Sequence, residues 1–206
     1  MLKLWGRINS INVQKVLWAL AELKVPYERT EAGLQFGVVN EPFYRRMNPN
    51  GRVPTIEDDG FVLWESNAIV RYLAAKHGAG TLWPNDLRER ADADHWMDWT
   101  TSTVAPALTP VFWGLIRTPP EKRNMAAIEA DAEKVGQAFQ VLEQSLEGRD
   151  HVAGGPFTMG DIPLGTFVHR WYALAVKRPK LPRVEAYYQR LQQRAQYKKH
   201  VMLPLS

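Results

Sequence analysis

The chain has 206 residues, of which 45% are hydrophobic and 23% are charged, as in an ordinary globular protein of one or two domains. Its net charge of +4 comes from scattered basic residues, so we expect no nucleic-acid interface. It has no cysteine, which excludes disulfides, thiolate zinc sites and catalysis by a thiol of this chain. The five histidines lack ligand-like spacing, so we expect no metal site.

The segments in the first 78 residues alternate between strand-like and helical patterns. This order, βαβα followed by ββα, predicts a layered α/β domain with an antiparallel edge. In chain order the expected elements are Leu2–Trp5, Val13–Lys24, Tyr27–Thr30, Pro42–Met47, Val53–Glu57, Phe61–Trp64 and Ser66–Gly78.

Strand signals stop after residues 79–87, which we interpret as a linker. Residues 88–206 are expected to form an all-helical domain, and Pro106 and Pro110 are expected to kink or split its first helical stretch. The expected helical stretches are Asp86–Arg117, Glu121–Glu147, Asp161–Ala175 and Val184–Gln193. No stretch approaches the roughly 18 apolar residues of a membrane span, and no signal peptide is recognised, so we expect no membrane partner and a cytoplasmic protein.

A turn at residues 48–51 is followed at once by Val53 and Pro54. A cis bond between them would turn the Val53 backbone outward and free its N–H and C=O for an extended peptide ligand. A trans proline that opens an ordinary strand is the alternative, and local physics favours it.

Glu65 and Ser66 stand where a strand gives way to a helix. A helix N-terminus offers free N–H groups and a positive dipole end, which suit a carboxylate. Ser66 could add a donor and Glu65 could receive an amino group, so together they match an α-amino-acid head. The alternative is that Ser66 only caps its helix.

Taken together, these motifs resemble those of the cytosolic glutathione transferases, and the resemblance covers essentially the whole chain. It implies an N-terminal thioredoxin-like domain followed by a helical bundle, with glutathione as cosubstrate. It also implies that Val53 and cis-Pro54 hold the cysteinyl part of glutathione, and that Glu65 and Ser66 hold its γ-glutamyl head. Arg52 stands where many members of the family place a basic residue near the ligand.

The segment from Phe157 to Ile162 reads as a helix capping box. Thr158 would cap the helix, Asp161 would reach back, and Phe157 could pack on Ile162. The family that this chain resembles carries such a box on a buried helix, so we expect a role in folding.

The loop after the first strand holds the candidates for stabilising the glutathione thiolate. Ser10 resembles the loop serine of serine-type (theta-like) transferases, and Asn12 is the rival because some bacterial relatives use a Ser-x-Asn loop. Either residue could instead merely cap the helix that follows. Tyr27 and Tyr44 are too far along the chain to serve.

The resemblance predicts a glutathione transferase that attacks a small, apolar electrophile. Trp113 is a candidate wall of the acceptor pocket, with core packing as the alternative. Two other functions stay open: a disulfide or peroxide reductase that uses two glutathiones, and a non-catalytic interaction module. By resemblance alone we expect a homodimer.

Overall fold

The computed structural model describes residues 1–206, and its first part is a mixed four-stranded sheet. The strand order is β2-β1-β3-β4, with β1 and β2 parallel and the other pairs antiparallel. The strands are β1 (Leu2–Trp5), β2 (Tyr27–Thr30), β3 (Thr55–Asp58) and β4 (Phe61–Trp64). The helices of this part are α1 (Ile11–Glu22), η1 (Leu34–Phe36), α2 (Pro42–Met47) and α3 (Ser66–His77).

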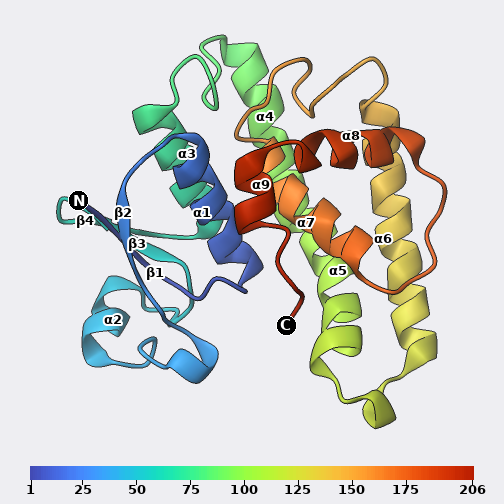
Figure 1. Cartoon of the computed structure of the whole chain (residues 1–206), viewed down its shortest axis with the longest axis horizontal. Coiled ribbons are helices and arrows are strands. Elements are labelled where there is room, and N and C mark those ends of the chain that lie inside the picture. Colours follow the sequence, from blue (N-terminus) through green and yellow to red (C-terminus); the bar gives the residue numbers. More distant parts are fainter.

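The second part contains only helices. They are α4 (Leu87–Trp99), η2 (Thr100–Val104), α5 (Ala105–Phe112), η3 (Trp113–Arg117), η4 (Pro120–Lys122), α6 (Met125–Ser145), α7 (Asp161–Ala173), α8 (Pro182–Gln192) and α9 (Ala195–His200). In Figure 1, α1 and α3 lie between the sheet and this helical part, whereas α2 lies away from it. None of the helices combines the length and the apolar character that crossing a bilayer requires.

The stretch from α4 to η3 stays helical throughout but changes its winding. The π-type segments η2 and η3 lie on either side of α5, which contains both prolines. Pro106 has no N–H to offer the carbonyl four residues before it, so the regular ladder is interrupted there. The predicted disturbance is therefore confirmed, as a change of helix type.

The predicted starts of α6 and β3 were wrong, and one helix was missed. The helix α6 begins at Met125 and not at Glu121, because Asn124 caps it by accepting the N–H of Ala127 at 3.1 Å. The strand β3 begins at Thr55, after the proline that cannot donate to the ladder. The short helix α9 was not predicted.

One hydrophobic core runs through both parts. Trp18 of α1 packs against Tyr197 of α9 and Phe157, with ring centroids 4.7 and 5.3 Å apart. Beside them, Arg194 donates to both carboxylate oxygens of Glu22, at 2.8 and 2.9 Å. The helix α1, and with it the loop that precedes it, is therefore held by the helical part.

The start of α7 forms one half of the expected capping box. The carboxylate of Asp161 is fully buried and accepts the N–H of Thr158 at 2.8 Å and that of Val152 at 3.1 Å. It also accepts the hydroxyl of Tyr187 at 2.9 Å. The Thr158 hydroxyl makes no cap, since it points at the same carboxylate at 3.4 Å. Phe157, in the loop before α7, packs on Trp18 of α1.

Candidate active site

Two open cavities flank the loop between β1 and α1. The first has a volume of about 550 Å³ and lies where α1, the start of α3 and η2 meet. The second has a volume of about 750 Å³ and lies between residues 51–53 of the sheet side and the end of α5. Asn12 lines both cavities, so a ligand that passes from one to the other crosses this loop.

Neither candidate for the thiolate donor caps α1. Ser10 stands at the N-cap position with extended backbone angles, yet its hydroxyl bonds to no helix N–H. It is largely buried and lines the second cavity. Asn12 is exposed, and its carboxamide oxygen accepts the Ser66 hydroxyl at 3.4 Å. The capping alternative for these two residues is therefore wrong.

The first cavity is built on the start of α3. Glu65 directly precedes the helix with φ +70°, a value that is strained for a residue with a side chain and that recurs at functional sites. The backbone N–H groups of Ser66, Asn67 and Ala68 hydrogen-bond to no other group of the chain. An exposed carboxylate thus stands beside a row of free donors, which suits a ligand with both an amino group and a carboxylate.

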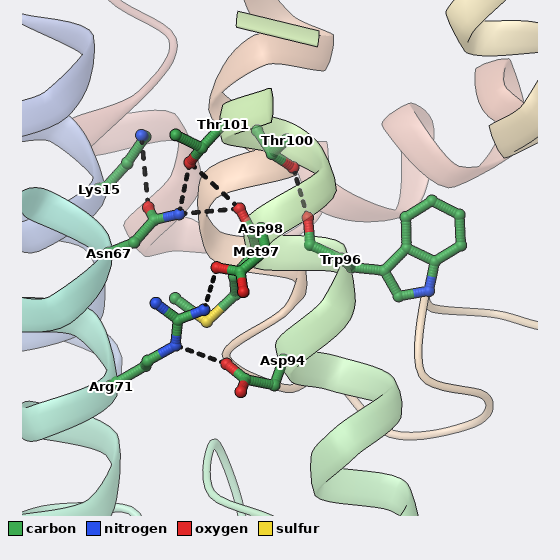
Figure 2. A network of polar contacts seen from close by, with 9 residues as sticks. All are labelled: Lys15, Asn67, Arg71, Asp94, Trp96, Met97, Asp98, Thr100 and Thr101. Carbon is green, nitrogen blue, oxygen red and sulfur yellow. Dashed lines mark hydrogen bonds and ion pairs between the residues drawn. The ribbon is translucent and has the colours of Figure 1, made fainter. Parts of the chain in front are cut away.

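A polar network, several members of which line this cavity, fixes α3 against α4 (Figure 2). The Asn67 side chain donates to the Met97 carbonyl at 2.8 Å and to the Thr101 hydroxyl at 3.0 Å. One turn further along α3, Arg71 donates to Asp94 and Asp98 of α4. These bonds immobilise the start of α3, so its free backbone N–H groups stay directed at the first cavity.

Lys15 is a member of the first cavity that sequence reasoning missed. It lies on α1, is almost fully buried, and donates to the Ser66 hydroxyl at 3.3 Å and to the Asn67 carboxamide oxygen at 3.4 Å. Burial lowers the pKa of Lys15 to about 7; the carboxylate of Glu65 opposes this shift and the charge of Arg170 adds to it. Its hydrogen-bond acceptors are neutral, so an incoming carboxylate would be its first charged partner.

The bond between Val53 and Pro54 is cis. The N–H and C=O of Val53 form no hydrogen bond, and the residue lines the second cavity. The turn is supported from behind, because Tyr44 and Asn48 both donate to the carbonyl of Arg52, at 2.7 and 2.9 Å. The Tyr44 hydroxyl is committed to this turn, in agreement with its exclusion as a thiolate donor.

Trp113 and Arg52 complete the predicted set. The indole of Trp113 is 58% exposed and lines the second cavity, so core packing does not describe it. Arg52 is exposed, lines the same cavity and makes no side-chain hydrogen bond. The structure therefore gathers seven of the eight predicted site residues on the two cavities, and the eighth, Pro54, is buried.

The sequence matches known proteins over its full length. Residues 1–75 match the profile of the Glutathione S-transferase, N-terminal domain, and residues 125–190 match that of the Glutathione S-transferase, C-terminal domain. Glutathione S-transferase GstB of Escherichia coli is 42% identical, with 100% of each chain covered. Glutathione S-transferase 4 of Zea mays is 30% identical over 92% of this chain and 86% of its own. This chain belongs to the glutathione S-transferase family.

A solved structure supports the same assignment. The theta class glutathione S-transferase of Xanthomonas axonopodis pv. citri, with glutathione bound, is 46% identical with a TM-score of 0.95 over 100% of this chain and 99% of that one. The predicted family, the fold class, the transferase activity and glutathione as cosubstrate are confirmed at the level of this glutathione S-transferase family.

Proposed function

We propose that this glutathione S-transferase binds glutathione across the loop before α1, with the γ-glutamyl head in the first cavity. The free N–H groups at the start of α3, the Ser66 hydroxyl and the Lys15 ammonium would bind the carboxylate of that head. Glu65, which has no partner among the side chains, would bind its amino group. The strained backbone of Glu65, directly before α3, supports this arrangement, because strain of this kind recurs at functional sites.

The cysteinyl part would pair with Val53. Its backbone N–H and C=O are free, and the cis bond to Pro54 turns them away from the ladder of β3. An extended peptide can satisfy both groups at once, as an added strand does. Arg52, exposed beside Val53, would bind the glycyl carboxylate.

Ser10 would donate a hydrogen bond to the glutathione thiolate. The single observation that carries the proposal concerns the Ser10 hydroxyl: it makes no cap hydrogen bond, although Ser10 stands at the start of α1 and lines the second cavity. A free thiol has a pKa of roughly 8.5, so a donor and the helix dipole are needed to hold the anion. Asn12 can add its amide N–H, since only its oxygen is engaged.

The second cavity would then present the electrophile to the thiolate, with Trp113 as one wall. The sulfur forms a bond to the electrophilic carbon, the thiol proton passes to solvent, and any leaving group departs with its electron pair.

Calorimetry with glutathione tests this binding mode. The wild type should bind at micromolar to millimolar concentration, and the double variant Glu65→Ala, Ser66→Ala should not. Ser145→Ala is a matched control, because this serine lies on α6 and bonds only to the Val141 carbonyl. Absence of binding by the wild type would refute the proposal. Turnover of an aryl chloride at first order in glutathione, without disulfide reduction, would exclude the reductase.

We further propose that residues 1–78 bind glutathione, that residues 88–206 complete the acceptor cavity, and that two chains form a cytoplasmic homodimer. The family assignment supports the dimer. Light scattering on the purified protein should give twice the mass of one chain, and a monomer at micromolar concentration would refute it.

A further inference from the structure

Three arginines from distant parts of the chain meet at the second cavity. Arg7 follows β1, Arg117 ends η3, and Arg170 lies on α7, and all three line the cavity. Their charges act on one another: burial, followed by the charges of Arg117 and Arg7, lowers the pKa of Arg170 to about 10. Burial and the charge of Arg117 likewise lower the pKa of Arg7.

No aspartate or glutamate side chain forms an ion pair with this arginine cluster. Arg170 is 9% exposed, and its guanidinium stacks on the Phe112 ring at 3.9 Å and donates no hydrogen bond. The Nε atoms of Arg7 and Arg117 are buried without an acceptor. The one acceptor that the cluster has is the Ser206 carbonyl, 2.6 Å from Nη2 of Arg117. Unpaired buried cations destabilise a fold, so the site is incomplete without an anion.

We propose that the second cavity selects an electrophile that carries a carboxylate, which the arginine cluster binds while the reactive carbon faces the thiolate. This inference rests on the function proposed above. Guanidinium groups bind carboxylates through two parallel N–H···O bonds, which fixes orientation as well as position. The apolar faces of Phe112 and Trp113 complete the cavity, so an aromatic acid fits it.

The glycyl carboxylate of glutathione is a less fitting occupant. Two of the three arginines belong to the helical side, where Arg170 lies against Phe112. Val53 and Arg52, which would hold the cysteinyl-glycine end, belong to the opposite, sheet side. Arg170 also lines the first cavity, but Arg7 and Arg117 line the second cavity only, so the three arginines come together where the electrophile would bind.

The reaction with such an acid is balanced without a further reactant. With 4-chloro-3-nitrobenzoate, the glutathione sulfur bonds to the chlorine-bearing carbon and chloride leaves with the electron pair of the broken bond. The thiol proton passes to solvent. The carboxylate, on the far side of the ring, is unchanged and remains on the arginines.

The test compares this acid with 4-chloro-3-nitrobenzamide, each rate divided by its uncatalysed rate. The wild type should prefer the acid by roughly tenfold or more, since a hydrogen-bonded charge contributes about 1.5–3 kcal/mol. Arg170→Gln and Arg7→Gln should remove the preference by raising KM for the acid alone. Arg88→Gln, an exposed arginine of α4, is the matched control and should keep it.

Binding of the unreactive 3-nitrobenzoate and 3-nitrobenzamide, measured by calorimetry, separates this inference from the proposed function. Preferential binding of the acid that is lost in Arg7→Gln supports the arginine cluster even if glutathione does not bind. Equal affinity for acid and amide in the wild type overturns it. A weakened affinity for glutathione in the arginine variants, with the acid preference intact, assigns the cluster to the peptide and also overturns it.

Discussion

The starts of α1 and α7 each bury a polar side chain, but the two side chains differ in whether the chain itself satisfies their hydrogen bonds. Both Ser10 and Asp161 are buried at a helix N-terminus. The Asp161 carboxylate accepts two backbone N–H groups and a tyrosine hydroxyl. The Ser10 hydroxyl bonds nothing of the helix and borders a cavity. A polar group whose bonds are all made within the chain stabilises the fold, whereas one left free at a cavity is available to a ligand.

The largest expected effect is on folding, at α7. Asp161→Ala leaves three buried donors without an acceptor, and each such group costs about 1–3 kcal/mol. The free energy of unfolding, measured with urea, should therefore fall by roughly 3 kcal/mol or more. Asp150→Ala is the control, because that carboxylate makes only a surface ion pair at 3.7 Å. An equal effect of the two variants would contradict this role.

At α1 the expected effect is on rate and not on folding. Ser10→Ala removes a hydrogen bond to the thiolate, worth about 1.5–3 kcal/mol, so kcat/KM should fall roughly 10- to 100-fold. The urea midpoint should stay unchanged, since the hydroxyl caps nothing. If Ser10→Ala instead lost stability and kept its turnover, Ser10 would have a role in folding, and Asn12 would be the donor to the thiolate.

A smaller, pH-dependent effect is expected at Lys15. Its pKa of about 7 means that the ammonium form prevails below this pH and is lost above it. Since the ammonium binds the carboxylate, affinity for the inert analogue S-methylglutathione should fall between pH 6 and 8, by up to about tenfold per unit. Lys15→Met should flatten this dependence, while Lys198→Met, at an exposed site on α9, should not. If the affinity depended on pH equally in the wild type and both variants, Lys15 would not be the group that binds the carboxylate.

The smallest effect is expected at Thr158. Its hydroxyl lies 3.4 Å from the Asp161 carboxylate and caps no helix N–H, so the bond that matters is made by its backbone. Thr158→Val should lower the free energy of unfolding by less than about 1 kcal/mol. A loss of stability as large as that of Asp161→Ala would show that the Thr158 hydroxyl also caps the helix, as the capping-box prediction stated.

Local sequence patterns predicted the elements that local physics controls. The antiparallel edge of the sheet and the disturbance at Pro106 follow from the residues themselves. The cis bond at Pro54 did not follow from them, since local physics favours trans; only the resemblance pointed to it. The helix α9 was missed because it is short and, unlike the equally short α2, has no proline in its first turn to mark its start.

Two parts of the site depend on tertiary structure. Lys15 was not singled out from the sequence, yet residues 13–20 are all buried. The five apolar residues that follow it, from Val16 to Leu20, were a signal that this helix is covered on every side. Arg7, Arg117 and Arg170 are separated by more than fifty residues each, so only the folded chain brings their charges together.

The position of Ser206 has a practical consequence for handling the protein. Its side chain and carbonyl lie beside Asn9 and Arg117, at the second cavity, whereas Met1 lies at the far end of the strands, near Asp59 (Figure 1). An affinity tag or fluorescent fusion joined after Ser206 would start at the cavity that receives the electrophile. Immobilisation through Met1 leaves that entrance clear, so surface-based screening of acidic compounds should use this end of the chain.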